Sequence, residues 1–257
     1  FNSLILATSV AAGGTLVGFI FAFAETRLSL PVFIKWFIGT VVVLPFVSPP
    51  FTSSIALTLV LGPNGLLLNF LGIPDFNIYG FLGTWIAETL TYFPVAFLTL
   101  AAVLRAIDPN LEDAAMSMGS SRWRTFRTVT LPLSAPGLAN AFLLLFGSSL
   151  ADFATPLVMA GHTFPVLTTQ AYLQITGMYD LRGGAAISFV LLIPAVLVYL
   201  LQHYWVERRS YVTVTGKVGI RTTPKGASGF IEILILAFIF LVTIFIIFLY
   251  SIIFLGS

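Results

Sequence analysis

The longest polar interruption in this otherwise apolar sequence is residues 105–136, and its residue types predict the start of a short helix. Asp108 is suited to cap free N–H groups at a helix N-terminus. Pro109 fits the first helical position, because its missing N–H would be unpaired there. Glu112 and Asp113 follow in the first turns, where the helix dipole stabilises negative charge. These residues predict a helix that begins at Pro109 and is acidic near its start.

The second part of this stretch predicts another short helix after a sharp turn. Gly119 is suited to the left-handed conformation that ends a helix, and Ser120 or Ser121 is suited to cap the next one. Pro132 and Pro136 predict the end of that helix. Three arginines make it basic: Arg122, Arg124 and Arg127. The whole stretch therefore predicts a charged helical hairpin that turns at Gly119.

Two acids, Glu88 and Asp152, lie inside long apolar segments. A carboxylate is costly there unless it faces protein or water. At 1.5 Å per residue, both lie about 12 Å inside the predicted ends of their segments, so one joint acidic site for a cation is a hypothesis. The alternative is that each carboxylate accepts a hydrogen bond from a nearby hydroxyl, such as Thr84, Thr91 or Thr155, and only stabilises packing.

A further polar group, His162, Tyr172, Tyr179 and Asp180, carries nitrogen and oxygen donors of the kind that ferric iron accepts. Loop structure is the alternative interpretation of these residues, and it is the one we favour.

The sequence offers no catalytic residue and no resident metal site. It contains no cysteine and no His-Glu-x-x-His pattern. The segment that ends in Gly216-Lys217-Val218 is not a phosphate-binding loop, because Val218 stands where Ser or Thr is needed and Tyr211 where the first glycine is needed. We therefore expect neither an ATPase nor a nucleic-acid-binding protein.

The elements that must position these residues are membrane helices. Hydrophobic residues make up 58% of the 257 residues and charged residues only 9%, against about 25% in soluble domains. The mean hydropathy is +1.02. With about 20 residues per span, the sequence predicts an all-α polytopic bundle with six spans: 3–24, 36–60, 80–104, 136–160, 184–206 and 230–255. Gly14 and Gly18 predict close helix packing.

Basic residues predict the orientation of these spans, because they accumulate in cytoplasmic connections. Eleven of the 12 Lys and Arg residues fall in alternate connections, and only Arg182 falls on the other side. This places 105–135 and the Gly- and Pro-containing linker 207–229 in the cytoplasm, and the Phe1 end outside. Lipid-phosphate contact or topology alone remains an alternative role for the hairpin arginines.

The hairpin also resembles a known motif. Asp113-Ala114-Ala115, three residues, Gly119, nine residues, then Val129-Thr-Leu131-Pro132 is similar to the EAA loop of the permease subunits of binding-protein-dependent ABC importers. Two positions depart from that pattern: Asp113 replaces Glu, and Val129 replaces Ile. The shorter acid weakens the contact that the family's Glu makes, and Glu112 is a possible substitute.

This resemblance implies a MetI-like permease fold with a cytoplasmic EAA coupling hairpin. It implies that residues 1–206 form the permease unit and that the hairpin docks on a dimer of ABC ATPase subunits, which bind ATP and Mg²⁺, so that this chain needs no cofactor. The expected docking residues are Glu112, Asp113, Ala114, Ala115, Gly119, Arg122, Arg124, Arg127, Leu131 and Pro132. An extracytoplasmic solute-binding protein, a second permease half and the lipid bilayer of a bacterial inner membrane are the other expected partners.

The order of elements resembles the fused double-length permeases of ferric iron importers. In that arrangement 230–257 holds the first helix of a second half, and 149–156 and 175–184 also look like that group. Related permeases serve polyamines, phosphonates, thiamine, sulfate and molybdate. The resemblance also implies that a separate binding protein coordinates the solute. Two rival hypotheses remain: an ion-coupled secondary transporter that uses Glu88 and Asp152, and a membrane scaffold that transports nothing.

Overall fold

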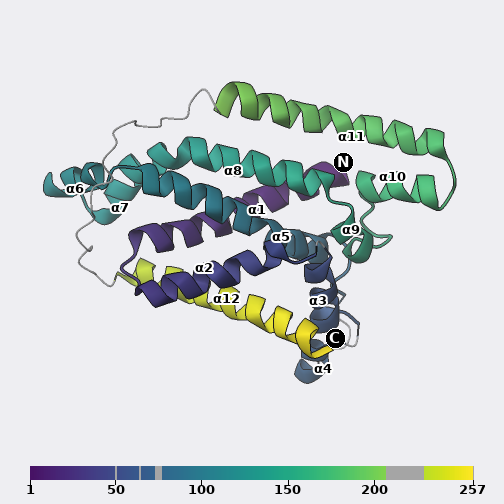
Figure 1. The fold of residues 1–257 in the computed structure, drawn as a ribbon, viewed down its shortest axis with the longest axis horizontal. Coiled ribbons are helices and arrows are strands. Elements are labelled where there is room, and N and C mark those ends of the chain that lie inside the picture. The colour runs from purple at the N-terminus through teal and green to yellow at the C-terminus, as the bar shows by residue number, and fades with distance from the viewer. Residues whose placement is uncertain (50, 64, 73–76, 207–228, 257) are drawn as a thin grey trace.

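The computed structural model describes residues 1–49, 51–63, 65–72, 77–206 and 229–256, and this part of the chain is all-α (Figure 1). Its longer helices lie side by side. The elements are α1 (Asn2–Arg27), α2 (Val32–Val47), α3 (Thr52–Leu61), α4 (Leu66–Leu71), α5 (Phe81–Ala106), α6 (Pro109–Ser117), α7 (Arg122–Thr125), the π-helix η1 (Phe126–Thr130), α8 (Leu131–Ala151), α9 (Ala154–Met159), α10 (Leu167–Thr176), α11 (Leu181–Leu201), the π-helix η2 (Gln202–Val206) and α12 (Phe230–Gly256).

Five of the described helices are long and apolar enough to cross a membrane, and a bent pair makes a sixth candidate. The bent pair is α2 with the helical segment that begins at Thr52, and its axes turn by 100°. Ser48 is extended there (φ −72°, ψ 158°), as a residue before a proline tends to be. The expected single span 36–60 is therefore broken near Pro49.

The core of the bundle is α1 packed against α5 and α8. Gly18 makes the close approach possible, because a Cβ at this position would lie 2.7 Å from the Cβ of Ala96 and 2.7 Å from the backbone nitrogen of Phe97. A Cβ at Gly14 would collide with Leu145 of α8. The predicted role of both glycines in close helix packing is confirmed.

The fourth predicted span differs from the structure. It was expected over 136–160, but the helix already begins at Arg122, runs through η1 and ends at Ala151. Asp152 is extended (φ −70°, ψ 126°), and α9 starts separately at Ala154. The break has a local cause, because the Asp152 carboxylate accepts hydrogen bonds from the backbone N–H groups of Ala154 and Thr155.

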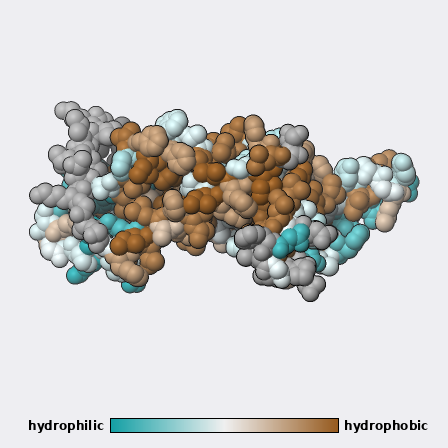
Figure 2. Space-filling model, turned by 90° about the horizontal axis from the view of Figure 1, so that it is seen from below, coloured by the Kyte–Doolittle hydropathy of each residue, from teal (hydrophilic) through white to brown (hydrophobic). Residues whose placement is uncertain are grey.

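The described surface has the polarity of a membrane protein. Figure 2 shows an apolar belt across the middle and hydrophilic residues towards the two ends. Large apolar side chains on α11, including Phe189, Leu192 and Leu197, are exposed. Helix α12 lies against α2 and α3 (Figure 1), and its Tyr250 hydroxyl is 2.6 Å from the Ser48 hydroxyl. The linker expected at 207–229 lies outside the described residues except for Gly229.

Candidate functional site: the charged hairpin and the buried acid pair

The hairpin turns as the sequence predicts, and local hydrogen bonds explain why. The Asp108 carboxylate accepts a hydrogen bond from Asn110 N–H at 2.9 Å and caps α6, with Pro109 in its first turn. Gly119 adopts a left-handed conformation (φ +86°), and its N–H donates to the carbonyl of Met116. Ser121 then caps α7, since its hydroxyl accepts from Arg124 N–H at 3.3 Å. In Figure 1 this hairpin projects from one end of the bundle.

The second helix of the hairpin does not end at Pro132, which corrects the prediction from the sequence. It continues through η1 into α8, and Pro136 also lies inside that helix. A proline inside a helix lacks an N–H donor and clashes with the preceding turn. The π-helical segment just before Pro132 widens that turn, and Leu131 N–H donates to the carbonyl of Phe126 across it. The hairpin is therefore continuous with a membrane helix.

The expected docking residues divide between two environments. Asp113, Ala114, Gly119, Arg124 and Arg127 are exposed. Pro132, at the base of the hairpin, is also exposed. Ala115 and Leu131 are half-buried.

Two neighbouring contacts and the burial of Glu112 were not predicted from the sequence. Arg122 pairs with Glu232 of α12 at 2.9 Å, and Trp123 is exposed while stacking on Phe126. Glu112 is buried and turned away from Asp113, so it does not replace that residue on the outer face. No local sequence pattern identifies Glu232 as the partner of Arg122, because the two residues are 110 positions apart. The same holds for Glu112, whose partners Arg27 and Thr130 are 85 and 18 positions away.

The two buried acids meet where α5 passes the α8–α9 break. Glu88 is completely buried and accepts a hydrogen bond from Ser149, and Asp152 interacts with it electrostatically. Tyr92 of α5 is also close enough to interact with both carboxyl groups. The two acids are therefore close enough to interact, which the hypothesis of a joint site requires. The estimate that Asp152 lies as deep as Glu88 was wrong, because it assumed one continuous helix from Asp152 to Ala160. The structure has a break there, between α8 and α9.

The hydroxyl partners expected for these acids are different in the structure. Thr84 and Thr91 donate to carbonyls of their own helix, those of Gly80 and Ala87. Thr155 contacts Asp152 through its backbone N–H instead. Within the described part of the chain, Glu88 Oε1 is buried without a hydrogen-bond partner, whereas the Asp152 carboxylate also interacts with the Tyr92 hydroxyl.

The residues considered as iron donors have ordinary structural roles or stand apart. Asp180 caps α11 by accepting from Gly183 N–H at 3.0 Å. Tyr172 packs against Phe153 with tilted rings whose centroids are 5.5 Å apart, and Tyr179 and His162 are exposed. Among the described residues, no three His, Cys, Asp or Glu side chains group as metal ligands would.

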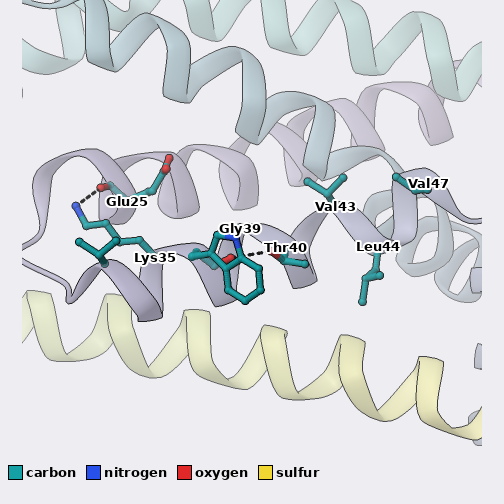
Figure 3. Close-up of a pocket in the computed structure, with 9 residues that line it drawn as sticks. Glu25, Lys35, Gly39, Thr40, Val43, Leu44 and Val47 are labelled. Atoms are coloured by element: carbon teal, nitrogen blue, oxygen red, sulfur yellow. Dashed lines mark hydrogen bonds between the residues drawn. The ribbon is translucent and has the colours of Figure 1, made fainter.

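A groove of about 540 Å³ lies along α2 (Figure 3). Its lining is mainly apolar, with Val43, Leu44 and Val47 at one end and Lys35 near Glu25 at the other. The Lys35 ammonium donates to the backbone carbonyl of Glu25 at 2.6 Å, and the Glu25 carboxylate pairs with Arg105 at 2.5 Å. The charged end of the groove is thus at the same end of the bundle as the hairpin.

Comparisons with known proteins agree with this architecture. The ferric transport system permease protein FbpB of Actinobacillus pleuropneumoniae is 40% identical over 223 residues, which are 84% of this chain and 32% of that protein. The chain thus spans about a third of the length of this relative. A probable sulfate transport system permease protein of Chlorella vulgaris is 31% identical over 78% of this chain and 77% of its own length. Molybdenum transport permeases match at 28% identity.

The fold itself recurs in a solved structure. A bacterial alginate ABC transporter, in complex with an alginate pentasaccharide-bound periplasmic protein, matches with a TM-score of 0.67 and 17% identity over 82% of this chain and 78% of that one. Residues 3–211 match a family model described as the binding-protein-dependent transport system inner membrane component. This chain therefore belongs to the family of inner membrane components of binding-protein-dependent transport systems.

Proposed function

We propose that this chain is a non-catalytic permease unit of an ATP-driven importer and that its hairpin docks on a separate ATPase. The observation that carries the proposal is the hairpin itself, which projects from the bundle while being continuous with α8 (Figure 1). A force applied to α6 and α7 would therefore act directly on a membrane helix. Membership of the family supports this proposal, since the family is one of membrane components of transport systems.

The exposed residues of the hairpin would form the docking surface. Ala114 and Ala115 have small side chains that allow close approach, and Gly119 forms the turn that presents them. Asp113 would accept hydrogen bonds from the ATPase, and Arg124 would pair with its acids. In this proposal the hairpin end of the bundle faces the cytoplasm, because the basic residues of the described chain gather there apart from Arg182.

Ferric iron is the solute that we propose first. The support is the 40% identity to a protein named a ferric transport permease, whereas the sulfate and molybdenum relatives are 28–31% identical. A separate binding protein would deliver the iron, and the chain itself would hold none at rest. That first relative is about three times as long as the matched region, which supports the proposal that α12 begins a second permease half.

The acid pair enters the proposal as part of the path for a cation. Both carboxylates are buried in the described chain, so the path would reach them only when the α8–α9 break opens. The unpartnered oxygen of Glu88 favours such a role over simple packing, because a buried polar atom without a partner is costly.

The deciding experiment reconstitutes the full-length protein with its ATPase and binding protein in proteoliposomes. We expect uptake of ⁵⁵Fe³⁺ delivered by the binding protein to need ATP inside the vesicles and to continue after the proton gradient is collapsed. Molybdate and sulfate serve as competing solutes. Uptake that is driven by the proton gradient without ATP would instead establish the ion-coupled alternative. Failure of an ATPase to copurify would support a scaffold.

A further inference from the structure

Adjacent acids in α6 face opposite ways. Asp113 is exposed, whereas the side chain of Glu112 is only 9% exposed. The proposed docking function uses the outward face, so it leaves the role of the buried carboxylate unexplained. A carboxylate is costly to bury unless charge and hydrogen bonds compensate it, so its partners indicate what it does.

Glu112 joins three separate elements. Its Oε1 atom accepts from Nε of Arg27, the last residue of α1, at 2.9 Å. The same oxygen accepts from the Thr130 hydroxyl, at the end of η1, at 2.8 Å. The Arg27 side chain is 7% exposed and Thr130 is 3% exposed, so the group is shielded from water. These three residues, which we name the hairpin joint, connect α6 to α1 and to the base of α8.

The position of the hairpin joint suits it to transmit movement. Helix α1 forms the core of the bundle with α5 and α8, and η1 continues without interruption into α8. The exposed pair between Arg122 and Glu232 is different, because its side chains are 52% and 30% exposed and exposed pairs contribute little. Breaking a buried pair from one side leaves an uncompensated charge. The hairpin joint therefore resists separation of α6 from α1 and α8.

We propose that Arg27, Glu112 and Thr130 are positioning residues for coupling: they make α6 move as one body with α1 and α8. The inference rests on the proposed docking of the hairpin on an ATPase, and it adds the internal connection that this docking needs. Without the hairpin joint, the ATPase would still bind the outward face of α6. Closure of the ATPase dimer would then displace the hairpin without moving the membrane helices.

The test uses the full-length complex in proteoliposomes and compares ATP hydrolysis with and without Fe³⁺-loaded binding protein. In Glu112→Gln and in Thr130→Val, we expect the ATPase to copurify in wild-type amounts. We expect stimulation by the binding protein to fall by about fivefold or more, as a lost coupling free energy implies. Thr130→Ser keeps the hydroxyl and should retain stimulation. The double variant Arg27→Glu with Glu112→Arg exchanges the two charges. It should restore part of the stimulation that either single variant loses.

Two control variants separate this inference from the proposed function. Glu232→Gln removes a carboxylate from an exposed arginine pair at the same end of the bundle and should leave stimulation unchanged. Asp113→Asn should instead reduce the amount of bound ATPase. Normal stimulation in both Thr130→Val and Glu112→Gln would overturn the hairpin joint. If the Glu112→Gln protein does not accumulate in the membrane, the stimulation measured for Thr130→Val decides whether the hairpin joint is correct. If the wild-type protein binds no ATPase, the proposed function fails instead.

Discussion

Gly119 is the residue on which the shape of the hairpin depends. Its backbone is left-handed (φ +86°), and a Cβ added there would meet no atom within 4 Å. The cost of a substitution is therefore a backbone cost of about 1–2 kcal/mol for an ordinary residue. We expect Gly119→Val to reduce copurification of the ATPase severalfold, because a β-branched residue resists this conformation.

Two further variants make the Gly119 prediction specific. Gly119→Asn should retain most binding, because asparagine tolerates the left-handed region better than valine. Gly147→Val also adds a side chain where no atom lies within 4 Å, but at a helical position of α8, and should bind the ATPase normally. Wild-type binding by Gly119→Val would show that this turn does not position the docking surface.

Asp152 caps the break between α8 and α9 and has a proposed role in the cation path, and one substitution separates the two. Its Oδ1 atom accepts from the N–H groups of Ala154 and Thr155, a role that an asparagine oxygen also fills. Asp152→Asn therefore removes the charge and keeps the helix break. We expect iron uptake to slow about tenfold while the amount of assembled complex stays unchanged. Asp180→Asn is the matched control, since it alters a similar cap at α11. An unchanged uptake rate in Asp152→Asn would leave the acid pair with a packing role only.

At the residue scale, the sequence predicts what is local. The caps by Asp108 and Ser121 and the turn at Gly119 depend on residues within three positions, so they are visible as spacing. The partners of Glu112 and Glu88 are not visible in this way. Arg27 is 85 positions from Glu112, and Ser149 is 61 positions from Glu88, so only the packing of helices brings them together.

At the element scale, prolines show why helix boundaries were harder to predict than helix existence. Pro94 and Pro136 lie inside continuous helices, whereas the helix before Pro49 ends. The same residue type therefore interrupts one span and not another. Neighbouring helices and local π-turns determine whether the groups freed by a proline find new partners, and the sequence does not show those neighbours.

The contact between α1 and α5 yields a prediction about a whole element. A side chain at Gly18 would overlap Ala96 and the backbone of Phe97, so the two helices would have to separate. Overpacking of this kind costs about 1–3 kcal/mol, and we expect Gly18→Val to lower the melting temperature of the purified protein in detergent. Gly39→Val, on α2 with no atom within 4 Å of the added Cβ, should melt near the wild-type temperature. Equal melting temperatures for both variants would contradict the close approach of α1 and α5.

At the scale of the whole molecule, charge distribution predicts orientation. The described basic residues lie at the hairpin end, except for Arg182 at the start of α11. Apolar side chains cover the belt between the two ends (Figure 2), so each end should face one side of the membrane. Composition therefore predicts the apolar belt, and charge predicts which end faces the cytoplasm, because both depend on sums over many residues rather than on individual contacts.

The orientation is testable because the 257 residues contain no cysteine, so one introduced cysteine gives this part of the protein a single thiol. Met118 in the hairpin is 83% exposed, and Met178 at the opposite end is 71% exposed. In intact bacterial cells that produce the full-length protein, we expect a membrane-impermeant maleimide to label Met178→Cys at once. It should label Met118→Cys only after the cells are permeabilised. Ala141→Cys, at a fully buried position, should remain unlabelled in both conditions. Labelling of Met118→Cys in intact cells would place the hairpin outside, where no ATPase can reach it, and both the proposed docking and the hairpin joint would lose their basis.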